Sequence, residues 1–218
     1  MKYNRKRIVA AIMSFAMVAG TFTYFPADTG FSIFKQMEIS AANSMVTSLI
    51  DSTNPGYVFT AYSDGTATIT DYTDTTSTNI EIPSKLTYSG SQYTVTSIGE
   101  RAFLYCENLV TINIPEGVTS IEDKAFYDCL KLTEITIPST VTTIGNNAFY
   151  SCNKLETVTF AENSQLREIT AAFVSCSALK SIVLPEGLTT ITSTSTDMGN
   201  GSYQIEGSFD RCTSLEPV

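Results

Sequence analysis

The stretch VTSIEDKAFYDCLKLTEITIP, from Val118 to Pro138, is one of four closely similar units in this chain. The other three begin at Val95, Val141 and Leu166, and they read VTSIGERAFLYCENLVTINIP, VTTIGNNAFYSCNKLETVTFA and LREITAAFVSCSALKSIVLP. A fixed period of this length is typical of a solenoid, because one unit cannot bury its own apolar face whereas stacked units bury a continuous core. The sequence therefore predicts a stack of coils.

The cysteines repeat with the units and mark their alignment. Successive cysteines are 23, 23, 24 and 36 residues apart, the last interval being one repeat plus a 13-residue insertion: Cys106, Cys129, Cys152, Cys176 and Cys212. Cysteines at one core position should stack with nearly parallel Cβ vectors, an orientation that does not favour a disulfide. We expect buried free thiols that pack as small hydrophobic side chains, and no metal site.

The end of each unit has the pattern of a short strand. Leu132, Ile135 and Ile137 follow L-x-x-L-x-L spacing, so their side chains should point inward while Glu134 and Thr136 point outward. Proline has no N–H for a neighbouring strand, and prolines end three of these segments, at Pro115, Pro138 and Pro185.

The run V-T-S-I-G-x-x-A-F-x-x-C-x-x-L-x-x-I-x-I-P resembles the BspA-like subclass of bacterial leucine-rich repeats, over about Tyr57 to Val218. The fourth unit departs from it by losing one residue between Ile169 and Phe173. The resemblance implies an α/β leucine-rich repeat solenoid dominated by strands, in which each repeat of 23 residues has a short parallel strand and a short helix or 3-10 turn. It also implies adhesion or scaffolding at a cell surface, with no catalysis and no cofactor.

The first 42 residues have the composition of an export signal. An apolar stretch from Ile8 to Phe25 follows a basic segment, which is typical of a secretory signal peptide. A retained membrane anchor is the alternative, because the stretch is nearly long enough to span a bilayer. Cleavage near Gly20 and cleavage after Ser40-Ala41-Ala42 both remain open. We expect a secreted, extracellular protein that is associated with the cell surface, without membrane insertion once the signal is removed.

Four segments follow from these patterns. Residues 1–42 are the signal peptide and leader, 43–56 a linker, 57–94 an N-terminal β cap, and 95–218 the repeats, with an insertion at 192–207. Within the cap, Val58 to Tyr62 and Thr66 to Thr70 flank the turn signal Asp64-Gly65 and predict a β-hairpin. Asn79 to Pro83 (NIEIP) copies the end of a repeat.

Charge and composition exclude several classes of function. Without residues 1–42 the chain has eight basic and 20 acidic residues, a net charge of about −12, which disfavours nucleic acid and anionic membranes as partners. The chain has no histidine, so it lacks the commonest general base. Two carboxylates suffice for a glycosidase, but the glutamates lie between core positions, where charged side chains face water. We expect no enzyme.

Two surfaces remain for recognition. The first is the outward side of the repeated strands, with candidate residues Glu81, Asn113, Glu134, Thr136, Thr157, Thr159 and Ser181. The second is the Ser, Thr and Gly-rich insertion, where Tyr203 is the candidate anchor. Tyr105, Tyr127 and Tyr150 lie in the A-F-x-x-C turn and either pack between coils or form an aromatic row.

The sequence predicts a binding or adhesion module whose partner is an extracellular or cell-surface protein, including glycoproteins. The alternatives are the targeting arm of a larger extracellular enzyme and a structural spacer. The last repeat stops inside its strand, at Val218, without a closing turn. Because an unfinished coil exposes a strand edge, self-association through an open C-terminal end is also expected.

Overall fold

The computed structural model describes residues 16–18, 21–23, 45–197 and 203–216. The chain divides into two units, residues 1–42 and residues 43–218. In the first unit, β1 (Ala16–Val18) pairs antiparallel with β2 (Thr21–Thr23). The rest of the expected signal peptide and leader lies outside the described residues. Over the described part of the chain, no helix has the length and apolarity needed to cross a membrane.

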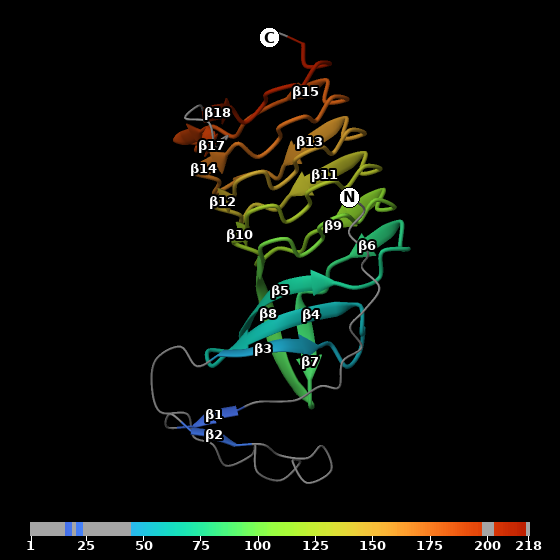
Figure 1. The fold of residues 1–218 in the computed structure, drawn as a ribbon, viewed down its shortest axis with the longest axis vertical. Coiled ribbons are helices and arrows are strands. Elements are labelled where there is room, and N and C mark those ends of the chain that lie inside the picture. Colours follow the sequence, from blue (N-terminus) through green and yellow to red (C-terminus); the bar gives the residue numbers. More distant parts are fainter. Residues whose placement is uncertain (1–15, 19–20, 24–44, 198–202, 217–218) are drawn as a thin grey trace. The chain divides into compact units, whose positions relative to one another are not determined.

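The repeats of the second unit form a β-solenoid of about four turns, built on two stacks of parallel strands (Figure 1). Each coil contributes one strand to each stack. The first stack contains β6 (Asn79–Glu81), β9 (Thr111–Asn113), β11 (Glu134–Ile137), β13 (Thr157–Phe160) and β15 (Ser181–Ile182). The second contains β8 (Ser91–Ile98), β10 (Ser120–Ile121), β12 (Thr143–Ile144), β14 (Glu168–Thr170) and β16 (Thr190–Thr192).

The prediction of a short helix or 3-10 turn in each repeat is wrong for the helix. The described residues contain no helix, and the A-F-x-x-C segment is a run of single turns. Arg101 and Tyr105 both have φ 60°, and left-handed residues four positions apart are incompatible with a continuous helix. A helix bonds its own N–H groups internally, whereas here the N–H of Phe103 donates to the carbonyl of Ala125 in the next coil, at 2.8 Å. The segment therefore bonds the coils to each other.

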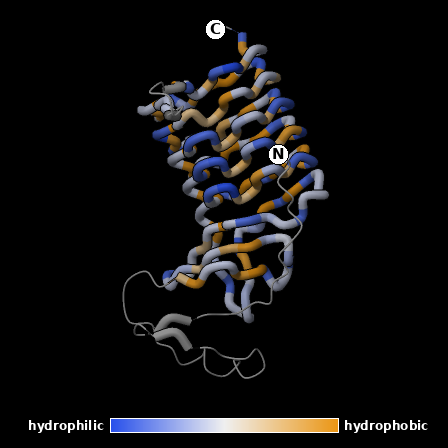
Figure 2. The backbone as a smooth tube through the Cα atoms, in the orientation of Figure 1, coloured by the Kyte–Doolittle hydropathy of each residue, from blue (hydrophilic) through white to orange (hydrophobic). Residues whose placement is uncertain are grey.

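A column of phenylalanines forms the centre of the solenoid. Phe103, Phe126, Phe149 and Phe173 are fully buried, and consecutive rings stack with centroids 5.1 Å apart. Hydrophobic segments recur at the same place in successive coils (Figure 2). Each such buried side chain contributes roughly 1.5–3 kcal/mol, so the repeated core supplies the main stabilising term.

The prediction of free cysteines is confirmed. All five are free thiols, four of them buried and Cys212 half-buried. The thiols of Cys129 and Cys176 donate to the carbonyls of Phe103 and Phe149 in the preceding coils, at 3.3 and 3.1 Å. Burial raises the pKa of the Cys129 thiol well above its ordinary value, which keeps it protonated and able to donate.

The N-terminal cap contains the predicted hairpin and two strands whose positions were not predicted. β4 (Tyr57–Tyr62) pairs antiparallel with β5 (Thr66–Tyr72), which confirms the hairpin around Asp64-Gly65. β3 (Met45–Ile50) pairs with β4 and buries Leu49 opposite Phe59. The range 43–56 is therefore not a simple linker. Most side chains of β3 are exposed, and only the pairing with β4 shows that this strand belongs to the sheet. β7 (Lys85–Tyr88) pairs with the start of β8.

The cap and the repeats share one sheet. β5 pairs in parallel with β8, placing Ile69 beside Ile98, and β8 pairs in turn with β10. Gly99 lies at this junction, where an added Cβ would be 2.7 Å from the carbonyl oxygen of Ile69. The contact requires glycine, because any larger residue would collide with the backbone of the cap.

The insertion forms a second hairpin outside the repeated strands. β17 (Thr194–Asp197) follows β16 and pairs antiparallel with β18 (Tyr203–Glu206). The chain then returns to the core at Ser208, which is buried, and Phe209 stacks on Phe173 at 5.8 Å.

Candidate functional site

The structure brings seven of the eight candidate residues together on one sheet. We call these the strand face; all seven side chains are exposed, and they belong to β6, β9, β11, β13 and β15: Glu81, Asn113, Glu134, Thr136, Thr157, Thr159 and Ser181. Glu134 is aligned with Thr157, and Thr157 with Ser181. The residues between them point inward, Ile135 and Val158 being 2% and 5% exposed. Strand alternation thus places the polar side chains in rows across the coils.

The strand face consists of short polar side chains. It offers hydroxyl, amide and carboxylate groups, with two acidic residues, Glu81 and Glu134, and no aromatic residue. Next to it, the hydroxyl of Thr111 donates to the side-chain oxygen of Asn79 at 2.7 Å, which links β9 to β6. Such a surface can recognise a partner by many separate hydrogen bonds, since it lacks the large anchors that dominate most interfaces.

Tyr203, the eighth candidate, lies on a different element. It is the first residue of β18, and its backbone is aligned with Asp197 of β17. This hairpin follows β16 in the other stack of strands, so it does not extend the strand face. The structure therefore places the backbone of Tyr203 on a separate hairpin.

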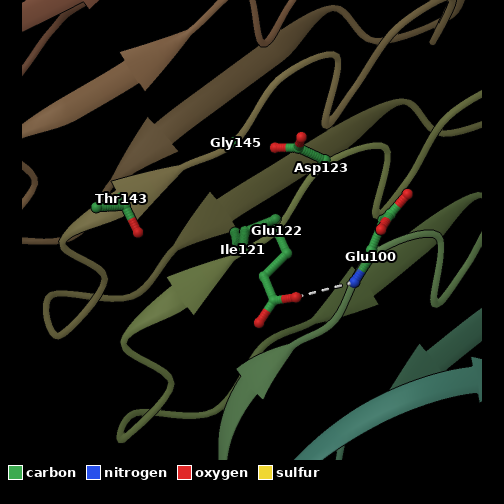
Figure 3. A pocket seen from close by; sticks show the side chains of 6 residues that line it. All are labelled: Glu100, Ile121, Glu122, Asp123, Thr143 and Gly145. Atoms are coloured by element: carbon green, nitrogen blue, oxygen red, sulfur yellow. Dashed lines mark hydrogen bonds between the residues drawn. The ribbon is translucent and has the colours of Figure 1, made fainter.

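The acidic residues of the turns connect coils. Glu100, Glu122 and Asp123 line a recess with Thr143 and Gly145 (Figure 3). The carboxylate of Glu122 accepts bonds from the Ser97 hydroxyl at 2.7 Å and from the Glu100 backbone N–H at 3.1 Å. Glu122 is thus more than a solvated side chain, contrary to the sequence interpretation, because its carboxylate bonds the preceding coil. In the described ranges, no group of three or more metal-binding side chains is present.

The tyrosines of the turns form a row, and they also pack between coils. Tyr127 stacks on Tyr150 with centroids 4.6 Å apart and an interplanar angle of 7°, while Tyr105 meets Tyr127 edge-on at 6.2 Å and 88°. Burial, with a smaller contribution from Tyr150, raises the pKa of Tyr127 to about 12. Tyr105 remains 39% exposed. Both interpretations of these tyrosines are therefore correct. Tyr127 and Tyr150 pack between coils, and the more exposed Tyr105 continues the aromatic row.

Sequence reasoning missed a second recess, which involves these tyrosines. Arg101, Leu104 and Tyr105 of one coil line it together with Lys124 and Tyr127 of the next. A signal was available, because Arg101 and Lys124 hold the same position in successive units. The residue at this position varies between repeats, so it is not part of the core pattern that predicted the fold.

The repeats match a known family. The BspA type leucine rich repeat region matches this chain in six copies over residues 72–197. The match covers more than half of the chain, and the chain belongs to this family. Members of this repeat family are typically not catalytic. A search of curated proteins gave no match.

Solved structures of bacterial leucine-rich repeat proteins are similar to this chain. The T. pallidum leucine rich repeat protein TpLRR is 27% identical with a TM-score of 0.61, over 73% of this chain and 66% of that one. A leucine-rich repeat protein from Bacteroides capillosus is 35% identical with a TM-score of 0.38, over 62% and 81% of the two chains. A leucine rich cell surface protein from Faecalibacterium prausnitzii is 24% identical with a TM-score of 0.42, over 78% and 54%. The first comparison supports the solenoid fold, and the chain spans just under two thirds of that relative.

Proposed function

We propose that this protein is a secreted or cell-surface binding module without catalytic activity, whose strand face binds an extracellular or cell-surface protein. The observation that carries the proposal is the alignment of seven exposed polar side chains on one sheet, above a fully buried core. Solenoids bind partners on extended faces of this kind, because the stacking holds the contact residues at a regular spacing.

Three further observations support this proposal. The basic segment and apolar stretch at the N-terminus have the pattern of an export signal. The chain belongs to a repeat family found in bacteria, and a relative of that type has been described as a cell surface protein. The acidic balance favours solubility and disfavours nucleic acid.

The composition of the strand face indicates that its binding affinity is distributed over several coils. Its side chains are threonine, serine, asparagine and glutamate, each of which offers one or two hydrogen bonds. The net gain from each bond is about 0.5–1.5 kcal/mol, so a partner must contact several strands at once to bind firmly.

A binding assay with paired variants tests the proposal. The protein is applied to immobilised extracellular matrix proteins, mucin and bacterial cell-wall material. Thr136→Arg and Thr159→Arg, which insert long side chains into the centre of the strand face, should abolish any binding. Thr190→Arg, on the exposed side of the other stack, adds the same charge and should bind normally. Equal binding by all three variants would place the interaction elsewhere, and no binding by the native protein would favour a spacer.

A further inference from the structure

The recess beside the tyrosine row combines two cations with two aromatic rings. We call it the tyrosine recess; its volume is about 230 Å³, and it is lined by Arg101, Leu104, Tyr105, Lys124 and Tyr127. These residues come from the turns of two adjacent coils, so the tyrosine recess is distinct from the strand face. It exists only because the coils stack.

The two cations of the tyrosine recess come from equivalent positions of adjacent coils. Arg101 and Lys124 occupy the same position in neighbouring coils, with φ 60° and 57°. The Phe103 and Phe126 rings of these two coils are 5.1 Å apart, so the backbone positions that carry the two cations are one coil apart. Like charges on adjacent coils repel each other, and an anion that contacts both would offset the repulsion.

Ion pairs compensate the two cations only weakly, although the carboxyls of Asp128 and Glu206 act electrostatically on Tyr127. Arg101 pairs with Glu100 at 2.8 Å, but both side chains are about half exposed, and such pairs are weak in water. Lys124 has no ion pair with any residue that the structure describes. The tyrosine recess is therefore suited to an anionic group.

The tyrosines supply a rigid flank for a ring. Tyr127 is fixed on one face by stacking on Tyr150, and Tyr105 is set at 88° to it. Tyr105 remains 39% exposed, and Leu104 adds apolar surface at the same place. Aromatic side chains held in this way present apolar area with little entropy left to lose on binding.

We propose that the tyrosine recess binds a carboxylated sugar, as a single sugar-acid unit of a larger glycan. The carboxylate binds the Arg101 guanidinium and the Lys124 ammonium, and the apolar side of the sugar ring packs against Tyr105 and Tyr127. The recess is smaller than the 300–1,000 Å³ of most small-molecule pockets, which limits the contact to about one ring. An acidic peptide fits less well, because an aspartate or glutamate side chain has no ring to occupy the flank.

The repeats themselves supply matched variants. Asn147 holds the position of Arg101 and Lys124 in the third unit with φ 55°, so Arg101→Asn and Lys124→Asn should keep the backbone. Ser151, with φ 56°, holds the position of Tyr105, so Tyr105→Ser is tolerated for the same reason. Lys154→Asn removes one exposed positive charge outside the tyrosine recess and serves as the control.

Calorimetry or saturation-transfer NMR on the full chain measures binding of 3′-sialyllactose, a hyaluronan tetrasaccharide, neutral lactose and hexaglutamate. We expect at least one of the two acidic sugars to bind and lactose not to bind. Arg101→Asn, Lys124→Asn and Tyr105→Ser should each weaken binding at least tenfold, whereas Lys154→Asn should leave it unchanged. The two acidic probes distinguish a sialic acid from a uronic acid.

Two results would overturn the proposal. Hexaglutamate binding that needs Arg101 and Lys124 but survives Tyr105→Ser would assign the tyrosine recess to acidic peptides. If neither acidic sugar binds, and the variants melt at the same temperature as the native protein, the tyrosine recess does not bind carboxylated sugars. Because the strand face is not mutated, neither result bears on protein binding there.

Discussion

The thiol of Cys152 donates a hydrogen bond to the carbonyl oxygen of Phe126, in the preceding coil, at 3.3 Å. Cys176 makes the equivalent bond to Phe149, and Cys212 to Phe173. A column of thiols therefore parallels the column of phenylalanine rings and gives each of these carbonyl groups a second donor, beside a backbone N–H such as that of Cys129 on Phe126. A disulfide between neighbouring coils would remove two of these donors, which explains why free thiols suit this core.

Thiol titration tests the cysteine column. In denaturant and without reductant, the purified protein should show five reactive thiols. In native buffer near neutral pH it should show close to none, because four thiols are buried and burial raises the pKa of the half-buried Cys212 to about 12. Three or one reactive thiols in denaturant would mean that disulfides form.

Urea melts test the inward and outward assignment of the strands. Phe126→Ala and Leu132→Ala remove fully buried side chains and should each lower the free energy of unfolding by about 2–5 kcal/mol. Thr136→Ala, on the exposed side of β11, should change it by less than about 0.5 kcal/mol. Comparable losses for both classes of variant would contradict the burial pattern.

Gly99→Ala tests the junction between the cap and the repeats. The new methyl group would lie 2.7 Å from the carbonyl oxygen of Ile69, so the two strands must separate, and we expect a loss of about 1–3 kcal/mol. Thr170→Ala changes the equivalent position of the fourth unit, which already has a side chain, and should cost less than about 1 kcal/mol. Similar melting temperatures for the two variants would rule out this contact as a constraint.

The loop before β6 should respond to acid. Bonds from the hydroxyls of Ser77 and Thr76 and from the Thr76 N–H lower the pKa of Asp74 to about 2. A carboxyl whose pKa is depressed in the folded state stabilises it above its ordinary pKa of about 4, and this stabilisation is lost as the pH falls toward 2. NMR titration of Asp74 should give the low value, and Ser77→Ala should raise it. An unchanged pKa in Ser77→Ala would mean that the Ser77 bond does not act on the carboxyl.

Several features of the fold are already determined by the sequence. The repeated phenylalanines and cysteines specify the stack, because each must be buried against its copy in the next coil, as Phe126 is against Phe149. The alternation of Glu134, Ile135, Thr136 and Ile137 specifies which sides face inward, since a strand has a period of two. The turn signal Asp64-Gly65 specifies the hairpin of the cap. All of these are local or periodic, and so they can be read from one chain.

Contacts between coils are decided by the tertiary structure. The A-F-x-x-C segment forms turns instead of a helix because alternate N–H groups, such as that of Phe103, find carbonyl partners in the adjacent coil, which no single repeat can reveal. Leu49 becomes core only when β3 pairs with β4. Arg101 and Lys124 are variable residues 23 positions apart in the sequence, yet stacking places them beside Tyr105 and Tyr127 in one recess. The period of the sequence specifies that coils stack, and the geometry of the stack determines which side chains meet.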